Sequence, residues 1–275
     1  MRKGFSLHEC SAIITGASSG LGAEFARQLA PQARSLLLAA RRIDALEQVK
    51  TELLVLRPGL AVHCVECDVA SDAGRAHLME RVDALGLTSN LLINNAGMGD
   101  YGSFASADEA RLRAQIDVNV TALAMLCHAF APRLQASAEV PAAILNVSSL
   151  AGNMPMPDMA VYGATKAFVT SFSEALRIEL MERHIIVTAV CPGPTATNFG
   201  RNARRPGGAD TNRSGQGLLR VPPSFVVGRA LRALQQREAC VFPGLGVSLV
   251  APLFRIMPRA LMRRLLERRY RKENP

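Results

Sequence analysis

Short apolar runs alternate with longer amphipathic segments along most of the chain. The runs of strand length cover residues 11–15, 35–40, 61–66, 91–94, 142–147 and 185–191, with a short candidate at 239–242. Helical spacing of apolar residues follows at 21–30, 43–56, 72–85, 108–134, 159–181 and 225–236, and a break is expected early in 108–134. Strands that alternate with helices predict a parallel sheet covered on both faces. With right-handed crossovers, the result is a doubly wound, three-layer α/β fold.

The composition and the charge exclude some classes of protein. Hydrophobic residues make up 49% of the 275 residues and charged residues 20%, which suffices for a large core and does not indicate disorder. Of the net charge of +9, residues 255–275 carry +6 and residues 200–220 carry +4, so the rest of the chain is nearly neutral. The chain has no tryptophan, and Tyr270 is the one aromatic residue of the two basic segments. We therefore expect no nucleic-acid partner.

The sequence also gives expectations about location and metals. No signal-peptide pattern follows Met1, and no run of 18 or more apolar residues predicts a membrane span. Six scattered cysteines in a long chain are typical of a reducing compartment, so we expect a cytoplasmic protein. Cys64 and Cys67 lie three apart on a predicted strand and face opposite sides, which suits neither a redox dithiol nor a zinc site. We assign no residue to a metal.

A glycine-rich segment, Gly16-Ala17-Ser18-Ser19-Gly20-Leu21-Gly22, joins the first predicted strand to the first predicted helix. Glycines permit a tight turn and the close approach of a pyrophosphate, while a helix N-terminus offers free N–H groups and a favourable dipole. The segment is therefore a candidate phosphate-binding loop for a dinucleotide. A turn that needs glycine for its conformation alone is the alternative.

Two arginines, Arg41 and Arg42, follow the second predicted strand. In a dinucleotide fold an acidic residue at this position binds the ribose 2′-hydroxyl, whereas arginine matches a 2′-phosphate. Cations are unfavourable at a helix N-terminus, which argues against a merely solvated helix start. The pair therefore favours NADP(H) over NAD(H). Asp68, at the end of the third strand and just before Val69, fits either a hydrogen bond to an adenine amino group or the start of the next turn.

Polar and glycine-rich clusters end three further strands. They are Asn94-Asn95-Ala96-Gly97, Asn146-Val147-Ser148-Ser149 and Cys191-Pro192-Gly193-Pro194. Parallel strands bring their carboxyl ends to one edge of the sheet, where such folds bind ligands. Asn119 lies in an apolar helical pattern although asparagine is a poor helix former, so it is either a satisfied core amide or a site residue.

Tyr162 and Lys166 are four residues apart on a predicted helix, and Tyr162 follows Ser149 by thirteen residues. Residues four apart share a helix face, so the two side chains should point the same way. A phenol has an ordinary pKa of about 10, and a nearby ammonium group lowers it. The pair is therefore a candidate general acid/base.

The combined pattern resembles the short-chain dehydrogenase/reductase family of Rossmann-type, NAD(P)-dependent oxidoreductases. The matching motifs are Thr15-Gly16-x-x-x-Gly20-x-Gly22, Asn94-Asn95-Ala96-Gly97, Asn119, Ser149, Tyr162-x-x-x-Lys166 and Pro192-Gly193, in family order across residues 10–245. The resemblance implies a mainly parallel seven-stranded sheet and one nicotinamide cofactor. It also implies a homodimer or homotetramer paired through the helices that start near Asp108 and Met159. Residues 1–245 would form one catalytic domain.

The resemblance further implies roles for individual residues. Tyr162 would protonate the developing alkoxide during carbonyl reduction, and Lys166 would bind the nicotinamide ribose and lower the pKa of Tyr162. Ser149, rather than its neighbour Ser148, would hold the substrate oxygen. Asn119 would hold a water in the proton relay. The implied cofactor contacts are Gly16, Ser18, Ser19, Gly20, Leu21, Gly22, Arg41, Arg42, Asp68, Val69, Asn95, Ala96, Gly97, Tyr162, Lys166, Pro192, Gly193 and Thr195.

Substrate choice should depend on residues 98–101, 150–158 and 195–222. The second segment is largely apolar, and flexible methionines such as Met154 and Met156 suit an adaptable hydrophobic pocket. The third is rich in glycine, arginine and asparagine and predicts a substrate lid. We expect a hydrophobic ketone or aldehyde as substrate. The alternatives are a non-catalytic regulator or scaffold that senses NADP(H), and a peripheral membrane enzyme that reduces lipid ketones.

Residues 246–275 differ from the rest of the chain. Residues 246–257 are nearly apolar and are interrupted by Pro252, and a basic amphipathic helix is predicted over 259–270. Such a helix is typical of contact with a membrane surface or a partner, which would involve residues 258–275. The alternative is a tail that packs on its own domain or across an oligomer interface, with its arginines extended into solvent.

Overall fold

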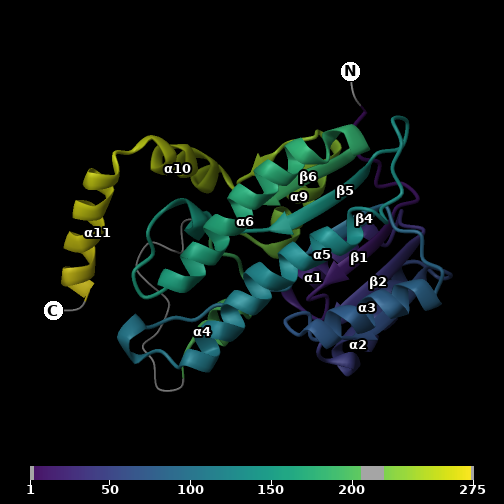
Figure 1. The fold of residues 1–275 in the computed structure, drawn as a ribbon, viewed down its shortest axis with the longest axis horizontal. Coiled ribbons are helices and arrows are strands. Elements are labelled where there is room, and N and C mark those ends of the chain that lie inside the picture. Colours follow the sequence, from purple (N-terminus) through teal and green to yellow (C-terminus); the bar gives the residue numbers. More distant parts are fainter. Residues whose placement is uncertain (1–2, 206–219, 274–275) are drawn as a thin grey trace.

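The computed structural model describes residues 3–205 and 220–273. Within them, seven parallel strands form one sheet in the order β3-β2-β1-β4-β5-β6-β7 (Figure 1). The strands are β1 Ser11–Thr15, β2 Ser35–Ala40, β3 Ala61–Glu66, β4 Leu91–Asn94, β5 Ala142–Val147, β6 Ile185–Val190 and β7 Cys240–Val241. The predicted doubly wound fold is confirmed. The last strand is shorter than predicted, because only two of its residues pair with β6 at the edge of the sheet.

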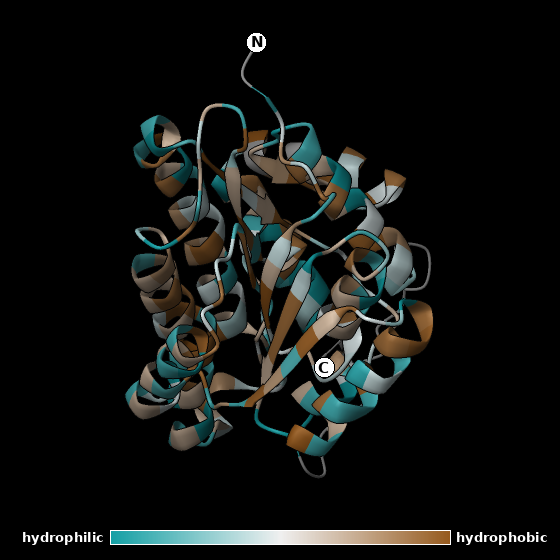
Figure 2. Cartoon of the chain, turned by 90° about the vertical axis from the view of Figure 1, so that its right-hand side faces the viewer, coloured by the Kyte–Doolittle hydropathy of each residue, from teal (hydrophilic) through white to brown (hydrophobic). Residues whose placement is uncertain are grey.

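Helices cover both faces of the sheet. One face packs against α1 (Gly20–Leu29), α2 (Ile43–Leu56) and α9 (Pro223–Gln235). The other packs against α3 (Asp72–Ala84), α5 (Leu123–Phe130) and α6 (Ala160–Glu179). Most strand residues are buried because both faces are covered, and Figure 2 shows the mainly hydrophobic strands between the two helical layers.

The helical segment predicted over 108–134 contains an irregularity in its middle rather than a break near its start. The α-helix α4 (Glu109–Ile116) continues into a π-helical segment, η2 (Asp117–Ala122), and then into α5. The predicted early break is therefore wrong. A π-helical turn widens a helix locally and often accompanies a functional site. Here it contains Asn119.

The order of the strands explains where the polar clusters meet. The chain runs outward from β1 to β3 and then returns to place β4 on the other side of β1. The register pairs Thr15 with Ala39 and Asn94 with Asn146, so the carboxyl ends of these strands share one edge. The edge beside β1 and β4 is the topological switch point at which open α/β sheets bind ligands.

The remaining elements of the described residues are several short helices and two longer helices near the C-terminus. The short ones are η1 Phe104–Ser106, η3 Leu150–Asn153, η4 Met181–Arg183 and α7 Phe199–Ala203. The longer ones, α10 Leu245–Ile256 and α11 Arg259–Glu273, lie at the end of the molecule opposite α2 and α3 (Figure 1). Helix α10 continues through position 252, so the proline there does not end it. Among the described residues, no helix has the length and apolarity needed to cross a membrane.

Candidate active site

Tyr162 and Lys166 lie together near the start of α6, and both side chains are buried. The Lys166 ammonium nitrogen Nζ is 5.8 Å from the centre of the Tyr162 ring. The same nitrogen donates a hydrogen bond of 2.8 Å to the carbonyl oxygen of Val147, at the carboxyl end of β5. Helix α6 and the sheet edge thus hold the pair in one place.

Burial shifts the pKa values of both groups toward their uncharged forms. It raises the pKa of Tyr162 to about 12, although the neighbouring Ser149 hydroxyl acts in the opposite direction. It lowers the pKa of Lys166 to about 8. The net shift of the Tyr162 pKa is therefore upward, because desolvation of the phenolate dominates, and the lowering of this pKa by Lys166 stays a prediction. At neutral pH Tyr162 carries its proton and can donate it.

The two adjacent serines have different surroundings. Ser148 is buried, and its hydroxyl lies 2.8 Å from the Lys166 carbonyl oxygen and 2.7 Å from the Thr170 hydroxyl. Ser149 is the N-cap residue of η3, where its hydroxyl oxygen accepts a bond from the backbone N–H of Ala151, and it lies close enough to Tyr162 to lower the pKa of that phenol. Ser148 therefore ties β5 to α6, while Ser149 is the serine beside the candidate acid/base.

The surroundings of Asn119 agree with both of its sequence-based interpretations, a satisfied core amide and a site residue. Its amide nitrogen donates to the Met98 carbonyl at 2.9 Å and to the Thr165 hydroxyl at 3.0 Å, and its amide oxygen accepts from the Met98 N–H at 3.0 Å. It is thus a satisfied, buried amide. A Cβ atom placed on Gly97 would lie 3.2 Å from the Asn119 oxygen and 3.5 Å from Lys166 Nζ, so Asn119 also borders the site.

The glycine-rich loop after β1 has the geometry of a phosphate cradle. Gly16 and Gly20 have φ angles of +63° and +58°, and a Cβ on Gly22 would collide with the Gly16 carbonyl. The Asn95 amide donates to the carbonyls of Thr15 and Gly16 at 2.9 and 3.1 Å, which fixes the loop from β4.

The start of α1 is open to an anion. Its N-cap residue, Ser19, makes no side-chain capping bond, and the first turn holds no acidic residue. The predicted contact Ser18 lies just before this turn, and the predicted contact Leu21 lies within it. A diphosphate would supply the missing partner for the first N–H groups of the helix, so the loop and the helix fit the pyrophosphate of a dinucleotide.

Arg41 and Arg42 are exposed at the end of β2, and neither side chain is bonded to another residue within 3–205 and 220–273. Asp68 is also exposed, and its carboxylate accepts a bond of 3.1 Å from the backbone N–H of Ala70. Asp68 therefore starts the turn before α3, whose N-cap is Ser71. Its neighbour Val69 is buried.

The segment after β6 passes over the glycine-rich loop. The Pro192 carbonyl accepts a bond from the Leu150 N–H at 2.8 Å, and the Thr195 hydroxyl donates to the Gly193 carbonyl at 3.0 Å. A Cβ on Gly20 would lie 3.6 Å from the Thr197 methyl group. Of the predicted lid, residues 195–205 and 220–222 are described, and residues 206–219 lie outside the described residues.

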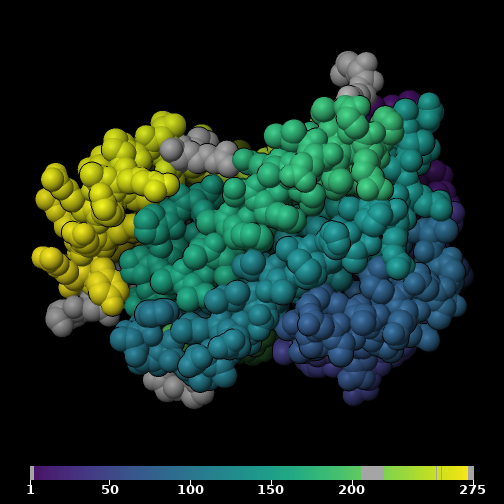
Figure 3. Space-filling model, viewed as in Figure 1, coloured from purple at the N-terminus to yellow at the C-terminus, as the bar shows by residue number. Residues whose placement is uncertain are grey.

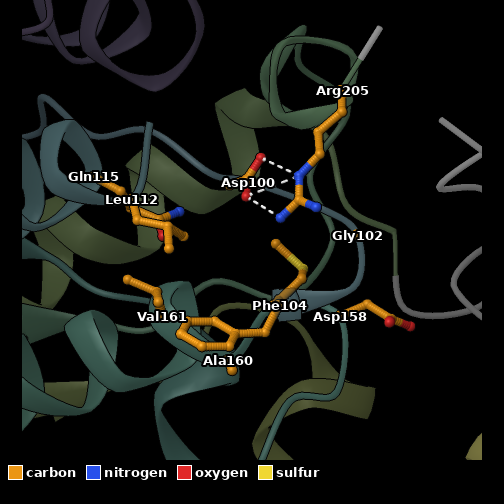
Figure 4. Close-up of a pocket in the computed structure, with 10 residues that line it drawn as sticks. Asp100, Gly102, Phe104, Leu112, Gln115, Asp158, Ala160, Val161 and Arg205 are labelled. Carbon is orange, nitrogen blue, oxygen red and sulfur yellow. Dashed lines mark hydrogen bonds and ion pairs between the residues drawn. The ribbon is translucent and has the colours of Figure 1, made fainter. Parts of the chain in front are cut away.

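Two features near the site could not be predicted from the sequence. The Phe199 ring of α7 packs on the Tyr162 ring, with 5.5 Å between the ring centres. The buried Asp100 carboxylate binds the guanidinium groups of Arg111 and Arg205, and Figure 4 shows its pair with Arg205. Burial alone would raise the pKa of Asp100, but the bonds and charges of the two arginines hold it below its ordinary value. The ring contact attaches the beginning of the predicted lid to α6, and the ion cluster attaches it to residues 98–106.

Comparison with known proteins gives the family. A family model described as "short chain dehydrogenase" matches residues 11–207. The chain belongs to the short-chain dehydrogenase family. Sulfoacetaldehyde reductase from Chromohalobacter salexigens is 40% identical over 191 residues, which cover 68% of this chain and 72% of that protein.

Two solved members of the family are similar to this short-chain dehydrogenase over most of their length. A short-chain dehydrogenase from Sphingobium yanoikuyae in complex with NADPH is 32% identical, with a TM-score of 0.74 and coverage of 88% of this chain and 90% of that one. A family member from Burkholderia phymatum in complex with NAD is 25% identical, with a TM-score of 0.77 and coverage of 90% and 94%. The relatives therefore support a nicotinamide dinucleotide without distinguishing its two forms.

Proposed function

We propose that this short-chain dehydrogenase reduces a carbonyl compound with NADPH, using Ser149, Tyr162 and Lys166. The observation that carries the proposal is a buried, protonated phenol with the Ser149 hydroxyl and the Lys166 ammonium group beside it at the ligand-binding edge of the sheet. When bound, the reduced nicotinamide supplies the hydride that adds to the carbonyl carbon. The Ser149 hydroxyl orients the carbonyl oxygen, and Tyr162 donates its phenolic proton to that oxygen, which yields the alcohol.

Lys166 completes the proposed mechanism. A charge near the ring stabilises the phenolate that remains after proton transfer, and Lys166 Nζ is 5.8 Å from the ring centre. The hydrogen bond to the Val147 carbonyl holds the ammonium group in position. Asn119 supports the arrangement through Thr165, whose hydroxyl donates to the Tyr162 carbonyl at 2.8 Å. The role of Asn119 in holding a relay water stays a prediction.

The preference for NADPH rests on Arg41 and Arg42. Two exposed guanidinium groups at the end of β2, with no bond to another described residue, are available for a 2′-phosphate. A fluorescence titration should show that Arg41→Ala/Arg42→Ala weakens NADPH binding by about 10- to 100-fold, the equivalent of about 1.4–2.8 kcal/mol, and leaves NADH binding unchanged. Arg263→Ala/Arg264→Ala on α11 removes the same charge elsewhere and serves as the control. NADH binding as tight as NADPH binding in the wild type would overturn the preference.

The proposed substrate is a hydrophobic ketone or aldehyde. The Phe199 ring covers one side of Tyr162, and Met156 lies against Gly163 beside it, 3.3 Å from where a Cβ would be. The relative from Chromohalobacter salexigens is named for a small anionic aldehyde, which is the rival class. Turnover of a carbonyl panel with NADPH separates the two. Activity confined to small anionic or sugar-like carbonyls would contradict the hydrophobic assignment.

A regulator that binds NADP(H) without catalysis is the alternative function. Its expected signature is a damaged Ser-Tyr-Lys set, and here the three side chains are present and close together.

We also propose a homodimer or homotetramer, since exposed apolar residues on α5 and α6, including Met125 and Phe168, form an outward surface. Light scattering of the purified protein measures the assembly. A monomer at micromolar concentration would contradict this proposal.

A further inference from the structure

Helix α10 is apolar on two opposite sides, and only one side is covered by the rest of the described residues. Val247 and Ala251 are buried and pack with Phe254 against Leu150 of η3. On the other side, Leu245, Leu249, Leu253 and Ile256 are 50% to 85% exposed. These four residues, called here the outer face of α10, recur at helical spacing and point away from the body of the protein.

Helix α11 adds charge to this surface. Leu261 and Leu265 are both close to half exposed, while Met262 is buried. The helix holds six arginines and one lysine against two glutamates, and residues 245–266 contain no acidic residue. Figure 3 shows α10 and α11 together at one end of the molecule. Exposed leucines thus stand beside a dense set of cations.

We propose that the outer face of α10, together with α11, docks on the anionic surface of a lipid bilayer. Leucines that enter the interfacial region, with arginines that reach lipid phosphates, are the chemistry by which a helix lies on a membrane. The helix of 12 residues is about 18 Å long, which is too short to span a bilayer core of about 30 Å. The helices therefore lie on the membrane and do not cross it.

Charge favours a lipid surface over a second copy of this chain. An association of two such tails would bring seven cations from each α11 close together, and like charges in contact are unfavourable. The chain outside its two basic segments is nearly neutral and offers no strong acidic counterpart. An anionic bilayer supplies both the apolar region and the negative charge that this surface lacks.

The docking surface is also next to the active site. The covered side of α10 packs on Leu150, which directly follows Ser149. A docked α10 would therefore place the segment beside Tyr162 close to the lipid, where an apolar carbonyl compound dissolves. Docking itself does not depend on the proposed reaction. Delivery of the substrate from the bilayer does rest on the proposed function.

Vesicle co-sedimentation of the full chain tests the proposal. The probes are vesicles of phosphatidylcholine alone and vesicles that also contain phosphatidylglycerol. We expect the wild type to bind the anionic vesicles and Leu249→Glu/Leu253→Glu to bind them at least tenfold more weakly. The control is Val55→Glu/Leu56→Glu on α2, where residues 78% and 57% exposed receive the same chemical change far from α10. The control should bind like the wild type.

Three results would overturn the proposal. They are no binding of the wild type to anionic vesicles at low salt, equal loss of binding in both double variants, and unchanged binding in Leu249→Glu/Leu253→Glu. Self-association that this variant abolishes, without vesicle binding, would assign the surface to a second copy instead.

Reduction of a water-soluble ketone is measured in parallel. An inactive wild type that still binds vesicles refutes the proposed reaction and leaves docking intact.

Discussion

Replacement of Asp100 by asparagine removes the negative charge from a cluster that joins three segments. The Asp100 carboxylate accepts bonds from Arg111 Nε at 2.6 Å and from Arg205 Nε and Nη2 at 3.0 and 2.5 Å. Arg205 also donates to the Ser103 carbonyl at 2.7 Å, and Arg111 to the Asn202 carbonyl at 3.0 Å. The cluster therefore links residues 98–106, α4 and the end of α7.

The magnitude follows from the burial of each partner. Loss of one member of a fully buried ion pair costs about 3–5 kcal/mol, because the remaining charge has no partner. Asp100 is 3% exposed, but the side chains of Arg205 and Arg111 are 16% and 26% exposed and regain some hydration. We therefore expect a loss of about 2 kcal/mol, somewhat below that range, which is about a 30-fold increase in local opening.

Hydrogen exchange of the Tyr101 amide measures this opening, because that N–H donates to the Ala203 carbonyl at 2.9 Å across the joined segments. Its exchange should accelerate about 30-fold in Asp100→Asn, while amides of β5 remain unchanged. Asp83→Asn is the matched control, since Asp83 pairs with Arg133 on the surface and such pairs contribute little. Exchange at Tyr101 that is equal in both variants would refute the reasoning.

Further predictions concern the catalytic groups and pH. Tyr162→Phe should lower carbonyl reduction by at least about 100-fold and change dinucleotide binding far less in the same titration. Ser149→Ala should lower kcat with little change in thermal stability, whereas Ser148→Ala, which removes buried hydrogen bonds to Lys166 and Thr170, should destabilise the fold by about 1–3 kcal/mol in urea unfolding. Because burial lowers the pKa of Lys166 to about 8, its charge is lost above that pH, and kcat/KM for reduction should decline there. The pKa of Asp100 is lowered on folding, so its ionised form stabilises the fold above its ordinary pKa, and this stabilisation is lost only as the pH falls through the lowered value. Unfolding curves should therefore show no loss of stability from Asp100 between about pH 5 and 8.

The positions of the strands could be predicted because a buried parallel strand has a simple signature. Residues 35–40 and 142–147, for example, are apolar runs bounded by turn residues, and both coincide with observed strands. The glycine-rich loop and the Tyr162–Lys166 pair could be placed for a similar reason, since each depends on contacts within a few residues. Local spacing determines local geometry, and the common edge of the sheet then brings these groups together.

Features that depend on distant contacts could not be predicted in this way. Asp100 and Arg205 are 105 positions apart, so no periodicity joins them. The π-helical segment around Asn119 arises where that amide bonds both backbone groups of Met98, a tertiary contact that helix propensity does not encode. The upward shift of the Tyr162 pKa could not be predicted either, because the spacing to Lys166 indicates a nearby charge but not the depth of burial.

That shift has a consequence for the direction of the reaction. Alcohol oxidation needs a phenolate to accept the substrate proton, whereas carbonyl reduction needs a phenol to donate one. Burial raises the pKa of Tyr162 to about 12 and so favours the phenol, the form required for reduction. The proposed binding of a 2′-phosphate by Arg41 and Arg42 is in keeping with the same direction. The phenol form at pH 7 is consistent with the proposed carbonyl reduction, for which the ratio of reductive to oxidative rates at pH 7 should exceed one; a ratio below one would contradict that proposal.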